Sequence, residues 1–376
     1  MATIQYLTRI EFDYGAIKTL PNLLSSLGIS KPLLVTDPFL SKTAIVGDIQ
    51  ELLSQFNPIL FANTPQNPTE DAVEEAVQVC LAEKCDGIIA IGGGSSIDLA
   101  KGVALLATHP GPIEQYAVIL GGLEKISSKV VPVIAVPTTA GTGSEVGRAA
   151  LISLRDGRKL GFISPHLIPK IALCDPELTL GLPPSLTAAT GMDALTHCIE
   201  TYLSPRVNPP ADAIAIDGAK RAATWIELAF NEGSNRDARW NMMMASLQGG
   251  LTFQKGLGAV HSMSHPLGGI KSPVLHHGTL NAVILPAVLR FNELYCTEKF
   301  AELKIAMGVP NGTSLDRFIE NLNQKLNLPK SLSAMGVTRG IIPAMVEGAL
   351  KDHSSASNPR PLSKKDFELL FEEALN

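Results

Sequence analysis

The fold of this chain is decided by the stretch Asp86-Gly87-Ile88-Ile89-Ala90-Ile91-Gly92-Gly93-Gly94-Ser95-Ser96-Ile97-Asp98. Residues 86–91 form a short apolar run, typical of a buried parallel strand. The glycine triplet ends this run, and an amphipathic helix is predicted over 99–108. A strand, a glycine turn and a helix start in this order form a cradle for a phosphate group. We therefore expect an α/β sheet that binds an anionic ligand at this turn.

Similar strands and helices alternate through the first half of the chain. Further strands are predicted at 31–37, 130–136 and 168–174, and helices at 14–27, 45–56 and 70–83. Such alternation indicates a parallel sheet of Rossmann-like type. From Ser185 onward only helical periodicity remains, notably at 211–230, 238–257 and 280–295. A chain of 376 residues normally forms two domains, and we place the boundary near Leu182, giving an α/β domain (1–182) and an all-α domain (183–376).

Composition excludes several classes of protein. The net charge is -5 and no run of Lys or Arg occurs, which disfavours nucleic acid as a partner. No apolar segment has the length of a membrane span, and residues 1–12 lack the pattern of a signal peptide, so we expect a cytoplasmic protein without membrane contact. Five cysteines at irregular spacings, without a CxxC pair, argue against disulfides and against a thiolate zinc site.

The glycine turn does not match the GxGxxG fingerprint of ordinary Rossmann folds. Its backbone can nevertheless approach a pyrophosphate, and Ser95 or Ser96 is predicted to cap the following helix. A tight turn with a serine cap and no ligand explains the same residues equally well. Asp37, at the end of an early strand, can bond the hydroxyls of an adenosine ribose and repel a 2'-phosphate, although aspartate is also common where a strand enters a turn.

The loop from Thr138 to Ser144 follows another buried strand and consists of Thr, Ser, Gly and Ala residues. Such a loop has little packing value, so we interpret it as a second ligand-binding segment. Lys159 follows this loop in the chain. It is either a solvated surface charge or a contact to a phosphate or ribose.

The strongest signal is a set of residues with metal-ligand chemistry. Asp193 and His197 are four apart, so a helix presents both side chains on one face. His261 and His265 repeat this spacing on a helix that is predicted to end there, because Pro266 disfavours helical geometry at His265. With the His276-His277 pair, four of the eight histidines fall within 261–277. One Asp and three His complete a four-ligand site; one histidine of the cluster is then not a ligand. The alternative is an Asp–His hydrogen-bonded pair with unrelated histidines.

These residues resemble the iron-containing (group III) alcohol dehydrogenases almost from end to end. The resemblance is carried by the stretches Gly92–Asp98, Pro137–Val146, Leu182–His197, His261–Gly268 and Asn358–Pro361. It implies a dehydroquinate synthase-like fold in which the first domain binds NAD and the helical domain binds Fe(II), with Zn(II) as an alternative. The substrate is then a small alcohol or aldehyde, and we expect a homodimer or a higher homo-oligomer.

The resemblance also implies the site residues. The metal ligands are Asp193, His197, His261 and His277. The NAD contacts are Asp37, Gly93, Gly94, Ser95, Thr138, Thr139, Thr142, Ser144, Val146 and Lys159.

Two positions depart from the family pattern. The spacing from His261 to the His-Gly pair is two residues longer than expected and the histidine is doubled, so His276 competes with His277 as the fourth ligand. His277 is preferred because Gly278 and Asn281 stay in phase with it. After Val146 the sequence continues with Gly147-Arg148, and Arg148 is either a surface residue or a contact to cofactor or acidic substrate.

In the expected reaction the metal supplies Lewis acidity while hydride passes between substrate and nicotinamide. His265 is our candidate for relaying the hydroxyl proton to solvent, and the alternative is that it orients a metal ligand. Two other enzyme classes fit the scaffold. A lyase of the dehydroquinate synthase type needs a basic pocket, for which the helical half offers few Lys or Arg. A metal-free reductase of the maleylacetate type has no need for Asp193 and His197.

Overall fold

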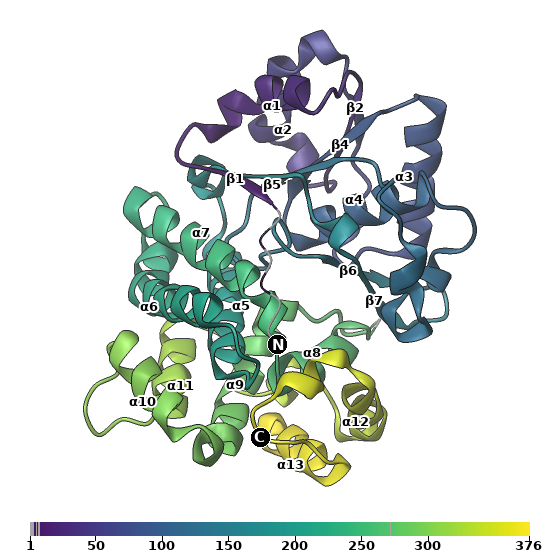
Figure 1. The fold of residues 1–376 in the computed structure, drawn as a ribbon. Helices are drawn as coiled ribbons and strands as arrows, with labels where there is room; N and C mark the ends of the chain where they lie inside the picture. The colour runs from purple at the N-terminus through teal and green to yellow at the C-terminus, as the bar shows by residue number, and fades with distance from the viewer. Residues whose placement is uncertain (1–3, 5, 7, 271) are drawn as a thin grey trace. The chain divides into compact units, whose positions relative to one another are not determined.

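The computed structural model describes residues 4, 6, 8–270 and 272–376. The chain divides into two compact units. The sheet unit contains residues 6–139 and 144–179, and the helical unit contains residues 140–143 and 180–376. Figure 1 labels the helices and strands of both units.

The sheet unit is built on six parallel strands in the order β1-β8-β5-β4-β2-β3. The four predicted strands are present as β2 (Pro32–Val35), β4 (Gly87–Gly92), β5 (Val133–Pro137) and β8 (Ile171–Cys174). The edge strands β1 (Arg9–Phe12) and β3 (Ile59–Phe61) were not predicted. Both are short and only partly buried, so neither has the continuous apolar run of a central strand.

Helices cover both faces of this sheet, which explains the unbroken apolar runs. Along β4, Ile88 and Ala90 belong to one core cluster, with residues of α3 (Glu70–Ala82) and α4 (Gly94–Leu106). Ile89 and Ile91 belong to a second cluster, with residues of α1 (Leu20–Ser26) and α2 (Ala44–Leu52). Because side chains of a strand alternate between faces, a strand buried on both sides must be apolar throughout.

In the sheet unit the start and the cap of one helix were predicted wrongly, and one hairpin was not predicted. Helix α4 begins at Gly94, five residues before the predicted start, and its N-cap is Gly93, which has no side chain to cap with. The hydroxyl of Ser95 instead donates to the carbonyl of Gln66. The antiparallel hairpin of β6 (Ala149–Ser153) and β7 (Lys159–Ile163) was not predicted, although buried and partly exposed positions alternate along both strands.

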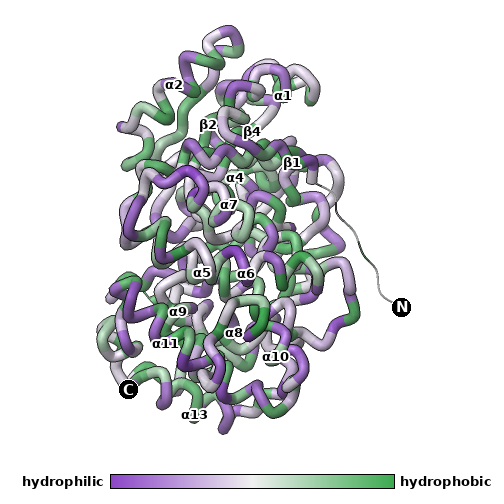
Figure 2. The backbone as a smooth tube through the Cα atoms, turned by 90° about the vertical axis from the view of Figure 1, so that its left-hand side faces the viewer, coloured by the Kyte–Doolittle hydropathy of each residue, from purple (hydrophilic) through white to green (hydrophobic). Residues whose placement is uncertain are grey.

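The helical unit is organised around α5 (Pro184–Leu203), in which every residue from Thr187 to Leu203 is buried. Its neighbours include α6 (Pro209–Asn231), α7 (Arg236–Leu251) and α9 (His277–Asn292). The remaining helices are α8 (Ala259–Gly268), α10 (Thr297–Ala306), α11 (Leu315–Lys325), α12 (Ile342–Lys351) and α13 (Lys364–Leu375). Figure 2 shows hydrophilic and hydrophobic residues following one another along these helices. No strand occurs among residues 180–270 and 272–376.

Helix α8 does not end at His265 but continues through Pro266 to Gly268, so that prediction was also wrong. The proline lies in the last turn, where its missing N–H removes a single helical hydrogen bond. Its ring packs against α12, since a Cβ atom on Gly348 would come within 2.7 Å of the ring. No helix in the described part of the chain combines the length and the apolar character needed to cross a membrane.

Candidate metal centre

The central feature of the helical unit is a buried carboxylate surrounded by imidazoles. Oδ1 of Asp193 lies 3.6 Å from Nε2 of His197, 3.8 Å from Nε2 of His261 and 3.7 Å from Nε2 of His277. Donor atoms that bind one ion tetrahedrally at about 2.0–2.2 Å are about 3.3–3.6 Å apart. These distances are close to that spacing, and the donor atoms of the buried residues Asp193, His197 and His261 all lie within 4.8 Å of one another. His277 is outside that group of three, although its Nε2 is near Oδ1 of Asp193.

Three helices supply these side chains, and close packing brings the helices together. Asp193 and His197 lie on α5, His261 on α8, and His277 is the first residue of α9. Gly278 permits the approach of α9, because a Cβ atom there would lie 2.1 Å from the carbonyl oxygen of Ala189 on α5. Only glycine fits this position without displacing one of the two helices.

A single amide marks the point on which the donor atoms converge. Nδ2 of Asn281 lies 2.7 Å from Oδ1 of Asp193, 3.1 Å from Nε2 of His261 and 3.2 Å from Nε2 of His277. An amide NH₂ group carries only two hydrogens, so it cannot donate fully to three acceptors. Oδ1 of the same side chain is buried and has no hydrogen-bond partner among the residues that the structure describes. The lone pairs of the carboxylate and the imidazoles thus face one small region, which is the arrangement that a cation requires.

Hydrogen bonds to the far ring nitrogens orient the histidines. Nδ1 of His197 donates to the carbonyl of Gly141 at 3.2 Å, and Nδ1 of His261 donates to Oε2 of Glu200 at 2.6 Å. With the proton on Nδ1, Nε2 keeps its lone pair for a metal. Sequence analysis did not identify Glu200 as a site residue. Its distance of seven residues from Asp193, two helical turns on one face, was the available signal.

Burial favours the neutral, metal-binding form of two imidazoles. Desolvation lowers the pKa of His197, although the charge of Asp193 opposes the shift. Desolvation, together with the neighbouring imidazoles, lowers the pKa of His261 well below its usual range. A divalent ion therefore does not have to displace a proton from either ring near neutral pH.

His265 is next to the centre, and the structure shows no bond from it to Asp193. Its ring stacks on that of His277, with centroids 5.5 Å apart and planes at 11°, and on that of His353 at 6.0 Å and 17°. Nδ1 of His265 donates to Oδ2 of Asp352 at 2.8 Å. Burial alone would raise the pKa of Asp352, but His265 and His353 outweigh this effect and hold it far below its usual range.

The predicted phosphate cradle lies at the carboxyl ends of β4 and β5. Gly93 and Gly94 open α4, the amide of Thr138 donates to the carbonyl of Gly92 at 3.0 Å, and a Cβ atom on Gly93 would contact Thr139 at 3.3 Å. Nζ of Lys159 donates to Oδ1 of Asn67 at 3.0 Å, and burial lowers the pKa of this lysine. Lys159 is therefore a partly buried lysine held by Asn67, and not a freely solvated surface charge.

Other predicted cofactor residues have structural partners of their own. Oδ1 of Asp37 accepts the amides of Phe39 at 2.8 Å and Leu40 at 3.0 Å, as an aspartate does at the entry to a turn. Thr142 lies in the segment 140–143 of the helical unit. Val146 is buried and Arg148 is exposed.

The Ser144 side chain belongs to a buried cluster that sequence analysis missed. Its hydroxyl donates to Oδ1 of Asp98 at 2.5 Å and accepts from Nζ of Lys101 at 2.7 Å. Lys101 is fully buried and also donates to the carbonyls of Ser144 at 2.7 Å, Gly147 at 2.9 Å and Ala149 at 2.8 Å. This lysine therefore fixes the backbone of residues 144–149.

Comparison with known proteins shows the family of the chain. Residues 8–176 match the family described as "Iron-containing alcohol dehydrogenase", and residues 187–375 match "Fe-containing alcohol dehydrogenase family, C-terminal". A 4-hydroxybutyrate dehydrogenase of Cupriavidus necator is 51% identical over the full length of both chains. A 1,3-propanediol dehydrogenase of Klebsiella pneumoniae is 37% identical, with 96% of each chain covered.

Solved structures give the same result. An alcohol dehydrogenase from Oenococcus oeni has a TM-score of 0.93 at 32% identity, over 99% of this chain and 100% of its own. A 1,3-propanediol oxidoreductase has a TM-score of 0.92 at 36% identity and covers both chains completely. The match extends through both halves of the sequence and confirms the resemblance that its motifs carried. The chain is therefore an oxidoreductase that belongs to the iron-containing alcohol dehydrogenase family.

Proposed function

We propose that this protein is an NAD-dependent dehydrogenase of a small alcohol that carries a terminal carboxylate, with 4-hydroxybutyrate as the first substrate to test. The proposal that the activity depends on a metal rests on one observation. Three imidazoles, of His197, His261 and His277, lie around the carboxylate of Asp193. The relative from Cupriavidus necator supports the substrate class, since it is 51% identical over both complete chains.

For the metal we propose Asp193, His197, His261 and His277 as ligands, with Fe(II) as the ion and Zn(II) as the alternative. Geometry favours His277 over His276, because Nε2 of His277 is 3.7 Å from Oδ1 of Asp193. A divalent ion at this place supplies Lewis acidity, which acidifies a hydroxyl group and polarises a carbonyl.

For the cofactor we propose that residues 1–182 bind NAD and that residues 183–376 hold the metal. The turn Gly93-Gly94-Ser95 at the start of α4 is the pyrophosphate site, and the loop residues Thr138, Thr139, Thr142, Ser144 and Val146 flank the nicotinamide. Lys159, a partly buried lysine, favours a phosphate or ribose oxygen. Oδ1 of Asp37 is used by the turn, so the ribose contact falls to Oδ2. NAD supplies the acceptor for the hydride.

For His265 we propose a role in moving the hydroxyl proton. The ring lies between those of His277 and His353, and the His353 side chain is 45% exposed. Stacked rings do not hydrogen-bond to one another, so a proton that leaves the centre through His265 reaches solvent by way of a bridging water. Asp352 holds His265 in the orientation that this transfer needs.

We further propose a cytoplasmic homodimer or higher homo-oligomer. All five cysteines are free thiols, which is the state of a reducing compartment. Light scattering coupled to size-exclusion chromatography measures the assembly directly.

The substrate proposal is tested by initial rates on a panel with NAD and with NADP. The panel contains 4-hydroxybutyrate, 1-butanol, 1,3-propanediol and methanol, and it uses protein reconstituted with Fe(II) or Zn(II). We expect the highest kcat/KM with 4-hydroxybutyrate and NAD. A higher value with 1-butanol would contradict a carboxylate-binding pocket. NADH must accumulate with turnover, whereas a lyase that uses NAD transiently produces none.

A further inference from the structure

We infer that Glu200 is a positioning residue of the metal centre, which sets the tautomer and orientation of His261 and thereby governs metal retention. This inference rests on the proposed metal site. Glu200 is 4% exposed, and its two oxygens have different partners. Oε2 accepts from Nδ1 of His261 at 2.6 Å, and Oε1 accepts from the amide of Val260 at 2.7 Å.

The two neighbours of His261 determine the state of its ring. When Glu200 is ionised its oxygens can only accept, and the single proton of the neutral imidazole is then on Nδ1. Nε2 then carries the lone pair, and it faces an amide donor, Nδ2 of Asn281, at 3.1 Å. A divalent ion held at Nε2 would make the Nδ1 proton a stronger donor to Glu200. The arrangement is thus the carboxylate–histidine pair that supports a metal ligand.

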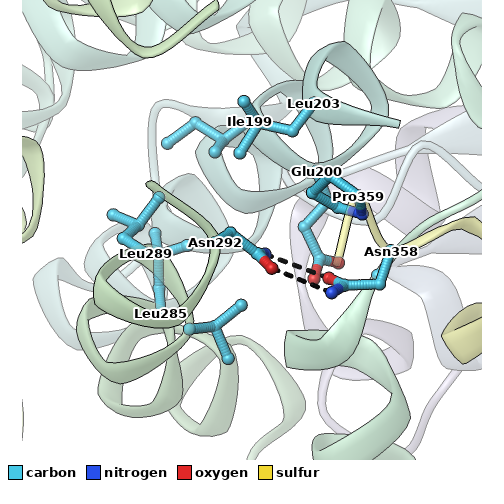
Figure 3. Close-up of a pocket in the computed structure, with 10 residues that line it drawn as sticks. Ile199, Glu200, Leu203, Leu285, Leu289, Asn292, Asn358 and Pro359 are labelled. Carbon is cyan, nitrogen blue, oxygen red and sulfur yellow. Dashed lines mark hydrogen bonds between the residues drawn. The ribbon is translucent and has the colours of Figure 1, made fainter. Parts of the chain in front are cut away.

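Glu200 also joins the two helices that supply ligands. It lies on α5 with Asp193, seven residues away on the same face, and its oxygens reach the first turn of α8. Apolar residues surround it: Ile199, Leu203, Leu285 and Leu289 line a small cavity beside the carboxylate (Figure 3). This cavity has room for about one water molecule. Glu200 and His261 are only 4% and 1% exposed, so bulk solvent does not compete for the bond between them.

The same cavity provides a matched control. Asn358 forms two hydrogen bonds with Asn292, drawn as dashed lines in Figure 3, and its Oδ1 accepts the amide of Ala259 at 3.1 Å. Asn358 therefore caps the same helix as Glu200, and no bond joins it to an imidazole. If Glu200 served only as a helix cap, replacing Glu200 or Asn358 would weaken metal affinity to the same extent.

The test is a metal titration of metal-free Glu200→Gln, Asn358→Ala and unsubstituted protein with Co²⁺, in competition with a chelator. Glutamine has one acceptor oxygen, so it cannot serve both His261 and Val260. We expect Glu200→Gln to raise the Kd for Co²⁺ by about 10- to 100-fold and to alter the visible spectrum of bound Co²⁺. Asn358→Ala should leave Kd within about threefold, even with a lowered melting temperature. Glu200→Asp, which keeps the carboxylate on a shorter side chain, should recover part of the affinity.

Circular dichroism establishes that each variant is folded, and Glu200→Asp serves as the test if Glu200→Gln does not fold. A Kd for Glu200→Gln within threefold of the unsubstituted protein would overturn the inference, and so would an equal weakening by Asn358→Ala. If the unsubstituted protein fails to bind Co²⁺, the proposed metal site fails with it. A Glu200→Gln Kd close to that of the unsubstituted protein, or equal weakening by Asn358→Ala, would overturn the role of Glu200 but leave the proposed metal site intact. Failure of the inference and failure of the metal site are therefore distinguishable.

Discussion

His265 and Asp352 are joined by a hydrogen bond of 2.8 Å between Nδ1 and Oδ2, although 87 residues separate them in the chain. The bond fixes the ring of His265 between those of His277 and His353. Asp352 is itself held in place, because its Oδ1 accepts the amide of Ser354 at 2.8 Å at the start of a 3₁₀ helix, His353–Ser357. His265 is thus fixed beside the metal-binding histidines without being one of the proposed ligands.

Replacing His265 by alanine should lower kcat and leave metal content unchanged. General acid–base groups contribute about 10²- to 10⁴-fold to rates, and we expect a loss at the lower end because solvent can substitute in part. The measurements are steady-state rates and elemental analysis of the same preparation. Asp352→Asn should give a smaller loss, since the amide oxygen still accepts from Nδ1. Loss of the metal from His265→Ala would show instead that this residue supports a ligand.

The adjacent histidines should respond differently to substitution. His277→Ala removes an imidazole whose Nε2 is 3.7 Å from Oδ1 of Asp193, so we expect most of the metal to be lost on purification. His276→Ala removes a side chain that is not among the proposed ligands, so metal content should be retained. Metal-to-protein ratios of both variants measure this. The reverse pattern would assign the fourth ligand to His276.

The sequence predicts the parts of the centre that follow from helical spacing. Asp193 with His197, and His261 with His265, are each four apart, and each pair lies on one helix as expected. The seven-residue spacing places Glu200 on the same face as Asp193, but spacing within one helix does not reveal its contact with His261 on another helix. Asp352 was missed for the same reason, since its partner His265 lies on α8. The start of α4 was misplaced because its N-cap residue, Gly93, has no side chain that would mark the helix start in the sequence.

Substitution of Gly278 should disrupt the centre without touching a ligand. A Cβ atom at this position would lie 2.1 Å from the carbonyl of Ala189 and 3.2 Å from Cβ of Asp193. Gly278→Ala therefore forces α9 away from α5 and moves His277 from Asp193. We expect the Kd for Co²⁺ to rise by at least about tenfold and the melting temperature to fall. Gly340→Ala is the control, because a Cβ atom there meets nothing within 4 Å. Unchanged metal affinity in Gly278→Ala would refute this account of the packing.

Replacing Lys101 by methionine should impair NAD binding. The change leaves the carbonyls of Ser144, Gly147 and Ala149 without their buried donor, at a cost of about 1–3 kcal/mol for each unsatisfied group. The loop that carries Ser144 and Val146 then loses its fixed backbone. We expect a weaker Kd for NAD by fluorescence titration and a lower free energy of unfolding. Lys125→Met, at an exposed lysine, is the control. An unaltered Kd for NAD in Lys101→Met would show that Lys101 does not support cofactor binding.

Glu145 should make stability depend on pH. Burial raises the pKa of its carboxyl to about 7, against the opposing effects of its own backbone amide and of Lys101. The folded protein therefore binds this proton more tightly than the unfolded chain, and the stabilisation is lost as pH rises from about 4.5 to about 7. Glu145→Gln cannot ionise, so its free energy of unfolding should improve relative to the unsubstituted protein by on the order of 1–3 kcal/mol between pH 5 and pH 8.

Urea unfolding of both proteins at pH 5, 6, 7 and 8 measures this difference. Metal release at low pH affects both proteins alike and cancels, because Glu145 is not among the proposed ligands. Glu124→Gln, at an exposed glutamate, should show no such trend. A difference between Glu145→Gln and the unsubstituted protein that stays constant from pH 5 to pH 8 would mean that Glu145 remains ionised throughout, with the Lys101 ammonium as its compensating charge.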